Sequence, residues 1–247
     1  MGESFGAYKI GDDAAMLEVV TTANIACGFH AGDPMVIQRT IRNAKRNRVA
    51  IGAHPSFADF YGFGRRRIIG DRPEDLEAQL IYQIAAVRGM AAAEDHAITH
   101  VKTHGALGNM AAEDASLAKI CVQAVMAVDP QLAFVALPYS ETEKAAEKAG
   151  LPVVREVFAD RTYTDQGQLT PRSEPGAVIL DIQQSIDQVM EMVVNRFIPT
   201  EGGKKLAVEP NTLCVHGDTP NAVQMALRLR KELSDAGIPI KSFAQPR

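Results

Sequence analysis

The sequence is poor in cysteine and carries no large excess of charge. Three cysteines, Cys27, Cys121 and Cys214, occur in 247 residues, and none belongs to a CxxC metal-binding pattern. They are too few and too isolated for a disulfide framework, so reduced, buried thiols in a cytosolic protein are the simpler interpretation. The formal net charge is -4 at pH 7, and the basic residues are scattered apart from positions 65–67. We therefore expect no nucleic-acid partner.

Long apolar runs and the familiar nucleotide motifs are also absent. No signal peptide and no apolar run of about 18 residues is present, which predicts a soluble, cytoplasmic protein with no membrane partner. The chain contains no GxxxxGK[ST] phosphate loop, no GxGxxG fingerprint after a strand and no GxSxG elbow. What remains is histidine, carboxylate and lysine chemistry, which suits hydrolytic opening of an amide or ester, or metal-assisted hydrolysis.

Apolar β-rich runs alternate with longer helix-like stretches along the whole chain. This order predicts βα units and a parallel sheet, and a length near 250 residues is typical of an α/β barrel. We expect a single domain over residues 1–247. The predicted strands are 21–27, 49–53, 98–103, 132–137, 153–157, 177–180 and 212–216, and the predicted helices are 34–47, 73–94, 113–127, 140–149, 182–196 and 219–236. The pair Gly202-Gly203 predicts a surface hairpin between Ile198 and Leu206.

Four strand-like runs end on a histidine that is followed by turn or helix-start residues. These histidines are His30, His54, His104 and His216. Polar side chains at the carboxyl ends of successive parallel strands assemble the reaction sites of α/β proteins. We therefore predict that the four histidines line one rim.

The third predicted strand is chemically the most informative. Side chains alternate faces along a strand, so His100, Lys102 and His104 share one face. Three titratable groups would be costly in a sealed core, which favours an open site. His100 lies deepest, where a hydrogen-bonded structural histidine is the alternative interpretation. His96 lies in a polar connection and is expected at the surface.

A long loop from Ser56 to Gly64 precedes a run of basic residues. Arg65 or Arg66 is predicted to hold a substrate carboxylate through a bidentate contact, with a solvated charge run as the alternative. The loop itself could form a lid.

Two carboxylates accompany the fifth predicted strand. Glu156 and Asp160 could act as general base, as metal ligand or as groups that order the loop. The alternative is an ion-pair network with Arg155, Arg161 and Arg172.

A third carboxylate follows the last predicted strand. Asp218 precedes Thr219-Pro220, so it either caps the last helix, with proline at the first helical position, or orients His216. Helix capping is the simpler of these two roles.

Seven motifs in order give the chain a resemblance to a known family. They are Gly2-Glu-Ser-Phe-Gly6, Ala23-Asn-Ile-Ala-Cys-Gly-Phe-His-Ala-Gly-Asp-Pro34, Gly52-Ala-His-Pro55, Gly62-Phe-Gly-Arg65, Val101-Lys-Thr-His-Gly-Ala-Leu107, Glu156-Val-Phe-Ala-Asp-Arg161 and Cys214-Val-His-Gly-Asp-Thr-Pro220. From Gly2 to about Gly237 the sequence resembles the LamB/YcsF family. The resemblance implies a seven-stranded (β/α) barrel-like fold of the glycoside hydrolase/deacetylase superfamily. It also implies ATP-dependent cleavage of 5-oxoproline to glutamate, with two further subunits, B and C, and with ATP used by the complex.

One departure from the family pattern concerns the N-terminus. Family members usually begin with a strand that reads roughly Asp-Leu-Asn-Cys-Asp before the Gly-Glu-Ser stretch, whereas this sequence starts at Met1-Gly2-Glu3. The first barrel strand is therefore expected to be missing, through a late start site or truncation. An exposed sheet edge would follow.

Within the implied reaction, each candidate residue takes a hypothetical role. Lys102 would stabilise negative charge on a phosphoryl or tetrahedral oxygen. The candidates for catalysis are His54, Lys102, His104 and Glu156, with the first, third and fourth as possible activators of water. The candidates for substrate binding are Asn24, His30, Arg65, Arg66, His216 and Asp218, with Asp218 orienting His216.

Two other functions stay open at this point. Histidines from separate strands, together with Asp160 or Asp218, could bind a divalent metal in a deacetylase or amide hydrolase, although no compact HxxxH pair occurs. The pocket could instead belong to a non-catalytic module that binds carbohydrate or a small acid. The sequence leaves open the metal's presence, the location of the ATP site and a homo-oligomeric state.

Overall fold

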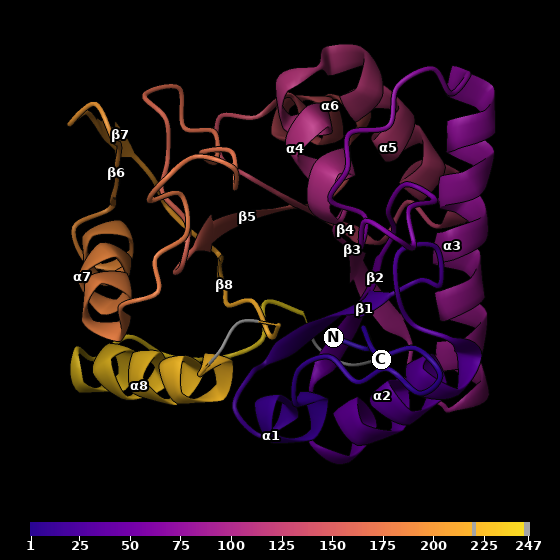
Figure 1. The fold of residues 1–247 in the computed structure, drawn as a ribbon, viewed down its shortest axis with the longest axis horizontal. Coiled ribbons are helices and arrows are strands. Elements are labelled where there is room, and N and C mark those ends of the chain that lie inside the picture. The colour runs from indigo at the N-terminus through magenta and orange to yellow at the C-terminus, as the bar shows by residue number, and fades with distance from the viewer. Residues whose placement is uncertain (219–220, 245–247) are drawn as a thin grey trace.

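One curled parallel sheet organises the molecule. The computed structural model describes residues 1–218 and 221–244. Six strands follow chain order in this sheet: β1 (Thr22–Ala26), β2 (Ala50–His54), β3 (Ile98–Val101), β4 (Ala133–Ala136), β5 (Val153–Phe158) and β8 (Thr212–Cys214). The sheet curls into a half-barrel with helices on its outer side (Figure 1). The α/β, barrel-like architecture is confirmed. The sheet has six strands among the described residues, and a strand preceding β1 stays a prediction.

The helices between the strands begin where the sequence signals predict. They are α1 (Asp13–Leu17), α2 (Pro34–Arg46), α3 (Pro73–Ala93), α4 (Gly105–Glu113), α5 (Ala115–Val128), α6 (Glu141–Ala149), α7 (Ile182–Val193) and α8 (Ala222–Asp235). Asp33 caps α2, because its Oδ1 accepts hydrogen bonds from the backbone N–H groups of Met35 and Val36 at 2.8 and 3.0 Å. Gly150 ends α6 with φ of 78° in the left-handed region.

The structure corrects several element predictions. Residues 177–180 form no strand, and only an isolated bridge joins Val178 to Arg161. The short helices α1 and α4 were not predicted. The predicted hairpin is confirmed, because β6 (Phe197–Pro199) pairs with β7 (Lys205–Ala207) in antiparallel register.

The start of the last helix lies partly outside the described residues. The predicted helix begins at 219, and Thr219 and Pro220 are not among the residues that the structure describes. The described part of α8 begins at Ala222, with Asn221 in the N-cap position. The sequence therefore placed the helix correctly, whereas its predicted cap cannot be Asp218.

The outer face of the sheet forms the main core. Ile25, Ile51, Val101 and Phe134 on successive strands are buried against the surrounding helices. A second apolar cluster joins β5 to α7 and α8. Packing on one face leaves the concave face of the half-barrel free for polar side chains.

The chain's first residue lies along the open edge of β1. The amino group of Met1 donates a hydrogen bond to the carbonyl of Asn24 at 3.0 Å, and the N–H of Ala26 donates to the carbonyl of Met1 at 3.0 Å. This contact brings Glu3 close to the carboxyl ends of the strands.

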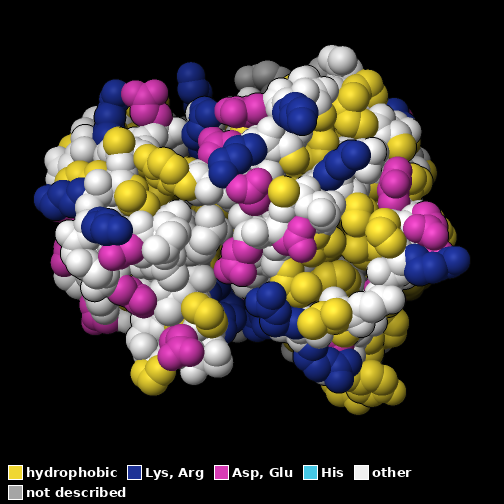
Figure 2. Space-filling model, turned by 90° about the horizontal axis from the view of Figure 1, so that it is seen from above, with side chains coloured by type: hydrophobic (Ala, Val, Ile, Leu, Met, Phe, Trp, Pro, Cys, Tyr) yellow, Lys and Arg dark blue, Asp and Glu magenta, His cyan; other side chains and the backbone are white. Residues whose placement is uncertain are grey.

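The surface carries charges of both signs. Figure 2 shows Lys and Arg side chains interspersed with Asp and Glu on the face seen from above, and no histidine is visible on that face. None of the helices in residues 1–218 and 221–244 is long and apolar enough to cross a bilayer.

Candidate functional site

A cavity of about 720 Å³ lies inside the curve of the half-barrel. Most of the candidates identified from the sequence line it, namely Asn24, His54, Arg65, Lys102, His104, Glu156, His216 and Asp218. His30 and Arg66 are not among the lining residues. The prediction that strand-end side chains converge is therefore confirmed for three of the four histidines, and His30 joins them indirectly by stacking on His104.

A buried ion pair crosses the interior of the sheet. Lys102 directly follows β3, and its ammonium forms an ion pair with Glu156 of β5. The Lys102 Nζ also lies 3.3 Å from the Cys214 sulfur and 4.7 Å from the centroid of the Phe158 ring. Burial lowers the pKa of Lys102, but Cys214 and Glu156 outweigh burial and raise that pKa above its usual range. The cavity therefore contains a permanent cation held by a carboxylate.

The hydrogen bond at His54 defines which ring nitrogen can act as a base. His54 ends β2, and its Nδ1 lies 2.6 Å from the carbonyl oxygen of Lys102. A carbonyl oxygen can only accept, so Nδ1 carries the proton and Nε2 keeps its lone pair. Burial and the charge of Lys102 hold the pKa of His54 well below its usual value. His54 is thus a neutral imidazole with a free acceptor nitrogen beside the cavity.

Two further histidines stack on one another next to His54. The rings of His30 and His104 have centroids 3.9 Å apart and planes 10° apart, and the His104 ring contacts His54 edge-on at 4.9 Å. Burial is the main cause that lowers the pKa of His30 to about 3. The pair therefore consists of neutral imidazoles.

His216 is oriented by a different carboxylate from the one predicted. Its Nδ1 lies 2.8 and 2.9 Å from the two carboxylate oxygens of Asp160. Although burial opposes it, the hydrogen bond from His216 lowers the pKa of Asp160 below its usual value. Asp218 instead forms a 2.7 Å ion pair with Arg65. The hypotheses that Asp218 orients His216 or caps the last helix are therefore wrong, because the Arg65 guanidinium holds its carboxylate.

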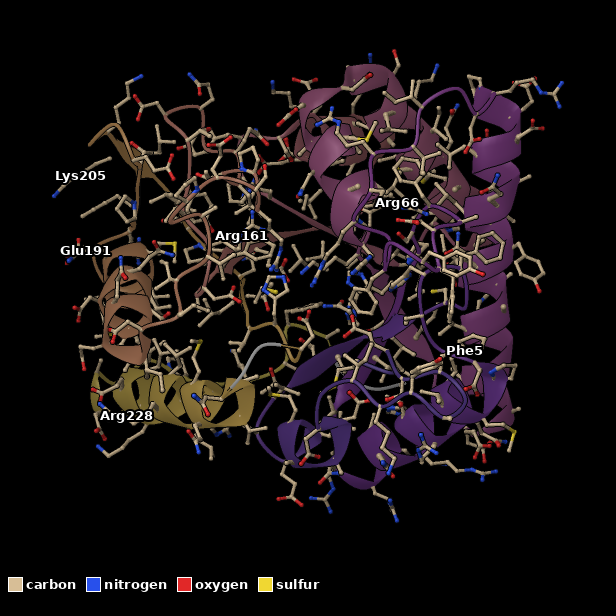
Figure 3. All side chains as sticks on the ribbon, viewed as in Figure 1. Phe5, Arg66, Arg161, Glu191, Lys205 and Arg228 are labelled. Atoms are coloured by element: carbon tan, nitrogen blue, oxygen red, sulfur yellow. The ribbon has the colours of Figure 1, made fainter. Side chains whose placement is uncertain are left out.

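The two arginines proposed as carboxylate ligands have separate positions. Arg65 lines the cavity, whereas Arg66 forms an ion pair with Asp59, a buried carboxylate within its own loop. Figure 3 shows Arg66 between α4 and α3, on the opposite side of the centre from Arg161. The prediction that Arg66 binds substrate is not supported by this position. Asp59 also accepts from the N–H of Gly62 at 3.0 Å, so the pair orders the loop.

The predicted ion-pair network around Glu156 and Asp160 does not form. Arg155 pairs with Glu143 and Glu147 at the protein's edge. The buried Arg161 donates to the backbone carbonyls of Ala177 and Thr170. Each carboxylate has instead found a partner inside the cavity.

Arg172 is a cavity residue whose role sequence reasoning missed. Within the part of the chain that the structure describes, its side chain has no hydrogen bond and no ion pair. Burial and the nearby Arg65 lower its pKa from the usual value. Its place in a polar segment after a strand was the available signal. A half-buried guanidinium without a described partner is suited to bind an anion.

The deepest layer of the cavity is structural. His100 is buried, and its Nε2 lies 3.0 Å from Oδ1 of Asn24 across β2. Gly52 allows this contact, because a Cβ at that position would lie 2.3 Å from the His100 ring. Asn24 therefore supports His100 as well as lining the cavity. The expected surface position of His96 is wrong, because that side chain is buried and its Nε2 lies 2.9 Å from the carbonyl of Val49.

Comparison with known proteins extends over nearly the whole chain. The model of the LamB/YcsF family matches residues 1–247. A protein of Bradyrhizobium diazoefficiens, named as 5-oxoprolinase A subunit 2, is 47% identical over 243 residues, which covers 98% of this chain and 95% of the relative. A 5-oxoprolinase A subunit of Azoarcus sp. is 50% identical over 237 residues, covering 96% and 92%.

Solved structures agree with these matches. The lactam utilization protein from Thermus thermophilus superposes with a TM-score of 0.92 at 42% identity, covering 98% of this chain and 97% of the other. A putative cellobiose-phosphate cleavage protein from Enterococcus faecalis V583 shares only the fold, with a TM-score of 0.51 at 12% identity over 93% and 89% of the two chains. The motifs, the half-barrel and the full-length match lead to one conclusion: this chain belongs to the LamB/YcsF family.

Proposed function

We propose that this chain is the A subunit of a 5-oxoprolinase, which cleaves 5-oxoproline to L-glutamate and couples the cleavage to ATP hydrolysis. The observation that carries this proposal is the nearly full-length match to relatives named as 5-oxoprolinase A subunits. The cavity adds chemical support, because it combines an imidazole base, a buried lysine and a guanidinium without a described partner.

The substrate is a small lactam with one carboxylate, and the charges of the cavity suit such a monoanion. Lys102 is balanced by Glu156, and Arg65 is balanced by Asp218. Arg172 supplies the cation that remains without a described partner. In this proposal, Arg172 holds the ring carboxylate with Arg65 beside it, since guanidinium groups bind carboxylates through paired hydrogen bonds.

The hydrolytic step places a water between His54 and the lactam carbonyl. His54 Nε2 accepts a proton from this water as the water oxygen attacks the carbonyl carbon. The C–N bond of the ring then breaks, and the proton passes to the departing amine nitrogen. Lys102 stabilises the negative charge that develops on the carbonyl oxygen. Phosphorylation of that oxygen by ATP within the complex would assist opening of this unstrained amide.

Two further parts of the proposal concern the protein's surroundings and ancestry. We propose subunits B and C as its partners and the cytoplasm as its location. The relatives' name, which makes each of them one lettered subunit of an enzyme, supports a multi-subunit assembly. The barrel-like sheet is proposed to be that of the glycoside hydrolase/deacetylase superfamily.

Reconstitution tests the activity directly. The chain is combined with subunits B and C, and the release of glutamate and phosphate from 5-oxoproline and ATP is followed. We expect glutamate only when all subunits and ATP are present. Binding of 5-oxoproline without any turnover in the complete mixture would overturn the proposal in favour of a small-acid binding module.

Replacing Arg172 tests how the substrate is held. Arg172→Gln removes a charged hydrogen-bond donor worth about 1.5–3 kcal/mol, so KM for 5-oxoproline should rise about 10- to 100-fold. Binding of 2-pyrrolidinone, which lacks the carboxylate, should be unaffected. Arg66→Gln is the matched control, because Arg66 pairs with Asp59 outside the cavity lining. Equal KM changes in the two variants would contradict the assignment.

A further inference from the structure

We propose that Glu3, His30 and His104 form a binding site for a divalent first-row transition-metal ion, with Zn²⁺ as the best-suited ion. One ligand atom from each of these residues lies within 4.8 Å of the other two. Two imidazoles and one carboxylate are a ligand set that binds zinc and related ions in hydrolytic and oxidative sites. This proposal does not depend on the chain's acting on 5-oxoproline.

The three residues reach the site from separate parts of the fold. His30 lies in the loop after β1, and His104 immediately precedes α4. Glu3 lies in the segment that the Met1 contact holds against β1. The site is thus built by the half-barrel itself and is not a cluster on one element.

Unpartnered nitrogen atoms are the independent evidence for a ligand. Both ring nitrogens of His30 and Nδ1 of His104 are buried without a hydrogen-bond partner among the described residues. His30 is 1% exposed and His104 6% exposed. A buried polar atom without a partner is destabilising, and native proteins satisfy nearly all such atoms. A bound ion would use the lone pairs that the protein leaves unpaired.

The surrounding charges leave the carboxylate available. Glu3 has a side chain that is 13% exposed, and the nearest cation to it is the Met1 amino group at 3.9 Å. That distance is long for an ion pair, so ligation of a metal would cost little existing interaction. Asp59, the other acidic group of this region, is held by Arg66.

Metal binding requires a defined movement of the two rings. Nitrogen and oxygen ligands at about 2.0–2.2 Å from a tetrahedral zinc lie about 3.3 Å from one another. The ion must also lie near the plane of each imidazole, whereas the rings of His30 and His104 are stacked face to face. We therefore expect the rings to splay on binding, bringing all three ligand atoms closer.

Three protein ligands leave a fourth position open. The His104 ring contacts His54, and both histidines line the cavity. An ion held by His104 would therefore lie next to the cavity, and its open position could take a water or a substrate oxygen. If the proposed function holds, that oxygen is the carbonyl of the lactam.

Direct metal binding by the full chain tests the proposal. The protein is stripped with a chelator and titrated with Zn²⁺ by calorimetry, and with Co²⁺ by visible absorption spectroscopy. We expect one equivalent bound at about micromolar Kd or tighter. The Co²⁺ complex should show the absorption bands of a low-coordinate site with nitrogen and oxygen ligands.

Variants identify the ligands and keep the test independent of folding. Glu3→Gln and His30→Gln should each weaken binding by at least about 100-fold, since even the loss of an outer partner of a ligand costs about 10- to 100-fold. Glu18→Gln, an exposed carboxylate, and His96→Gln, a buried histidine at the other end of the sheet, are the matched controls. Thermal melts verify that each variant folds.

Two results would overturn the proposal. One is the absence of stoichiometric Zn²⁺ and Co²⁺ binding by the folded wild-type chain. The other is binding that is unchanged in both Glu3→Gln and His30→Gln. Loss of glutamate formation with metal binding intact would count against the proposed function alone, and the reverse result would count against the metal site alone.

Discussion

Removing the charge of Lys102 is expected to destabilise the protein strongly. The side chains of Lys102 and Glu156 are only 12% and 6% exposed, so Lys102→Met leaves a buried carboxylate without its cation. Breaking a buried pair in this way costs about 3–5 kcal/mol. At about 2–4 °C per kcal/mol for a chain of this size, Tm should fall by about 6–20 °C.

Removing both charges should restore most of that stability. In Lys102→Met/Glu156→Gln no unpaired charge stays buried, and replacing both partners of a buried pair is often close to neutral. We expect the double variant to lie within about 1 kcal/mol of the wild type, with a coupling energy of about 2–3 kcal/mol between the two positions. Glutamate formation should nevertheless be lost, because the cavity then has no cation facing the carbonyl oxygen.

Urea and thermal unfolding of the wild type, both single variants and the double variant measure the stability part. Reconstitution with subunits B and C measures the activity part. A Lys102→Met variant as stable as the wild type would refute the inference that the pair is buried and mutually dependent. A double variant that still forms glutamate near the wild-type rate would refute the role of Lys102 in the reaction.

Two further predictions concern the deepest layer of the cavity. Gly52→Ala should destabilise the protein by about 1–3 kcal/mol through overpacking, because the new Cβ would lie 2.3 Å from the His100 ring; an unchanged Tm would contradict this geometry. Burial lowers the pKa of His100 to about 3, so the unfolded chain takes up a proton near pH 6.5 that the folded chain refuses. Stability should therefore fall as the pH drops from about 6.5 toward 3, by about 1.4 kcal/mol per pH unit from this residue. Urea unfolding between pH 7 and pH 4 should show a shallower slope for His100→Gln than for the wild type.

Local sequence signals predicted much of the framework. The alternation of strand-like and helix-like runs predicts the parallel sheet, and Asp33-Pro34 predicts the start of α2. Alternation along the third strand places His100 and Lys102 on the same face, and both side chains do lie inside the half-barrel. These features depend on residues a few positions apart, so the sequence contains the information that determines them.

The sequence could not predict the partners of the charged groups. His216 meets Asp160 and not Asp218, although Asp218 is only two residues away. Asp218 meets Arg65 across a sequence separation of 153 residues. Each pair exists because the curled sheet places β8 beside β5 and brings the loop after β2 over the same opening.

The family, the strand order and the kinds of side chain at the strand ends all follow from the order of the amino acids. The folded chain was needed to show that Arg172 is left without a described partner while Arg66 is bound to Asp59. Folding also brought Glu3 to the paired imidazoles of His30 and His104. The physical reason is range: secondary structure follows from neighbours within one or two turns, whereas ion pairing and ligation require atoms within about 4 Å, which only the closure of the fold supplies.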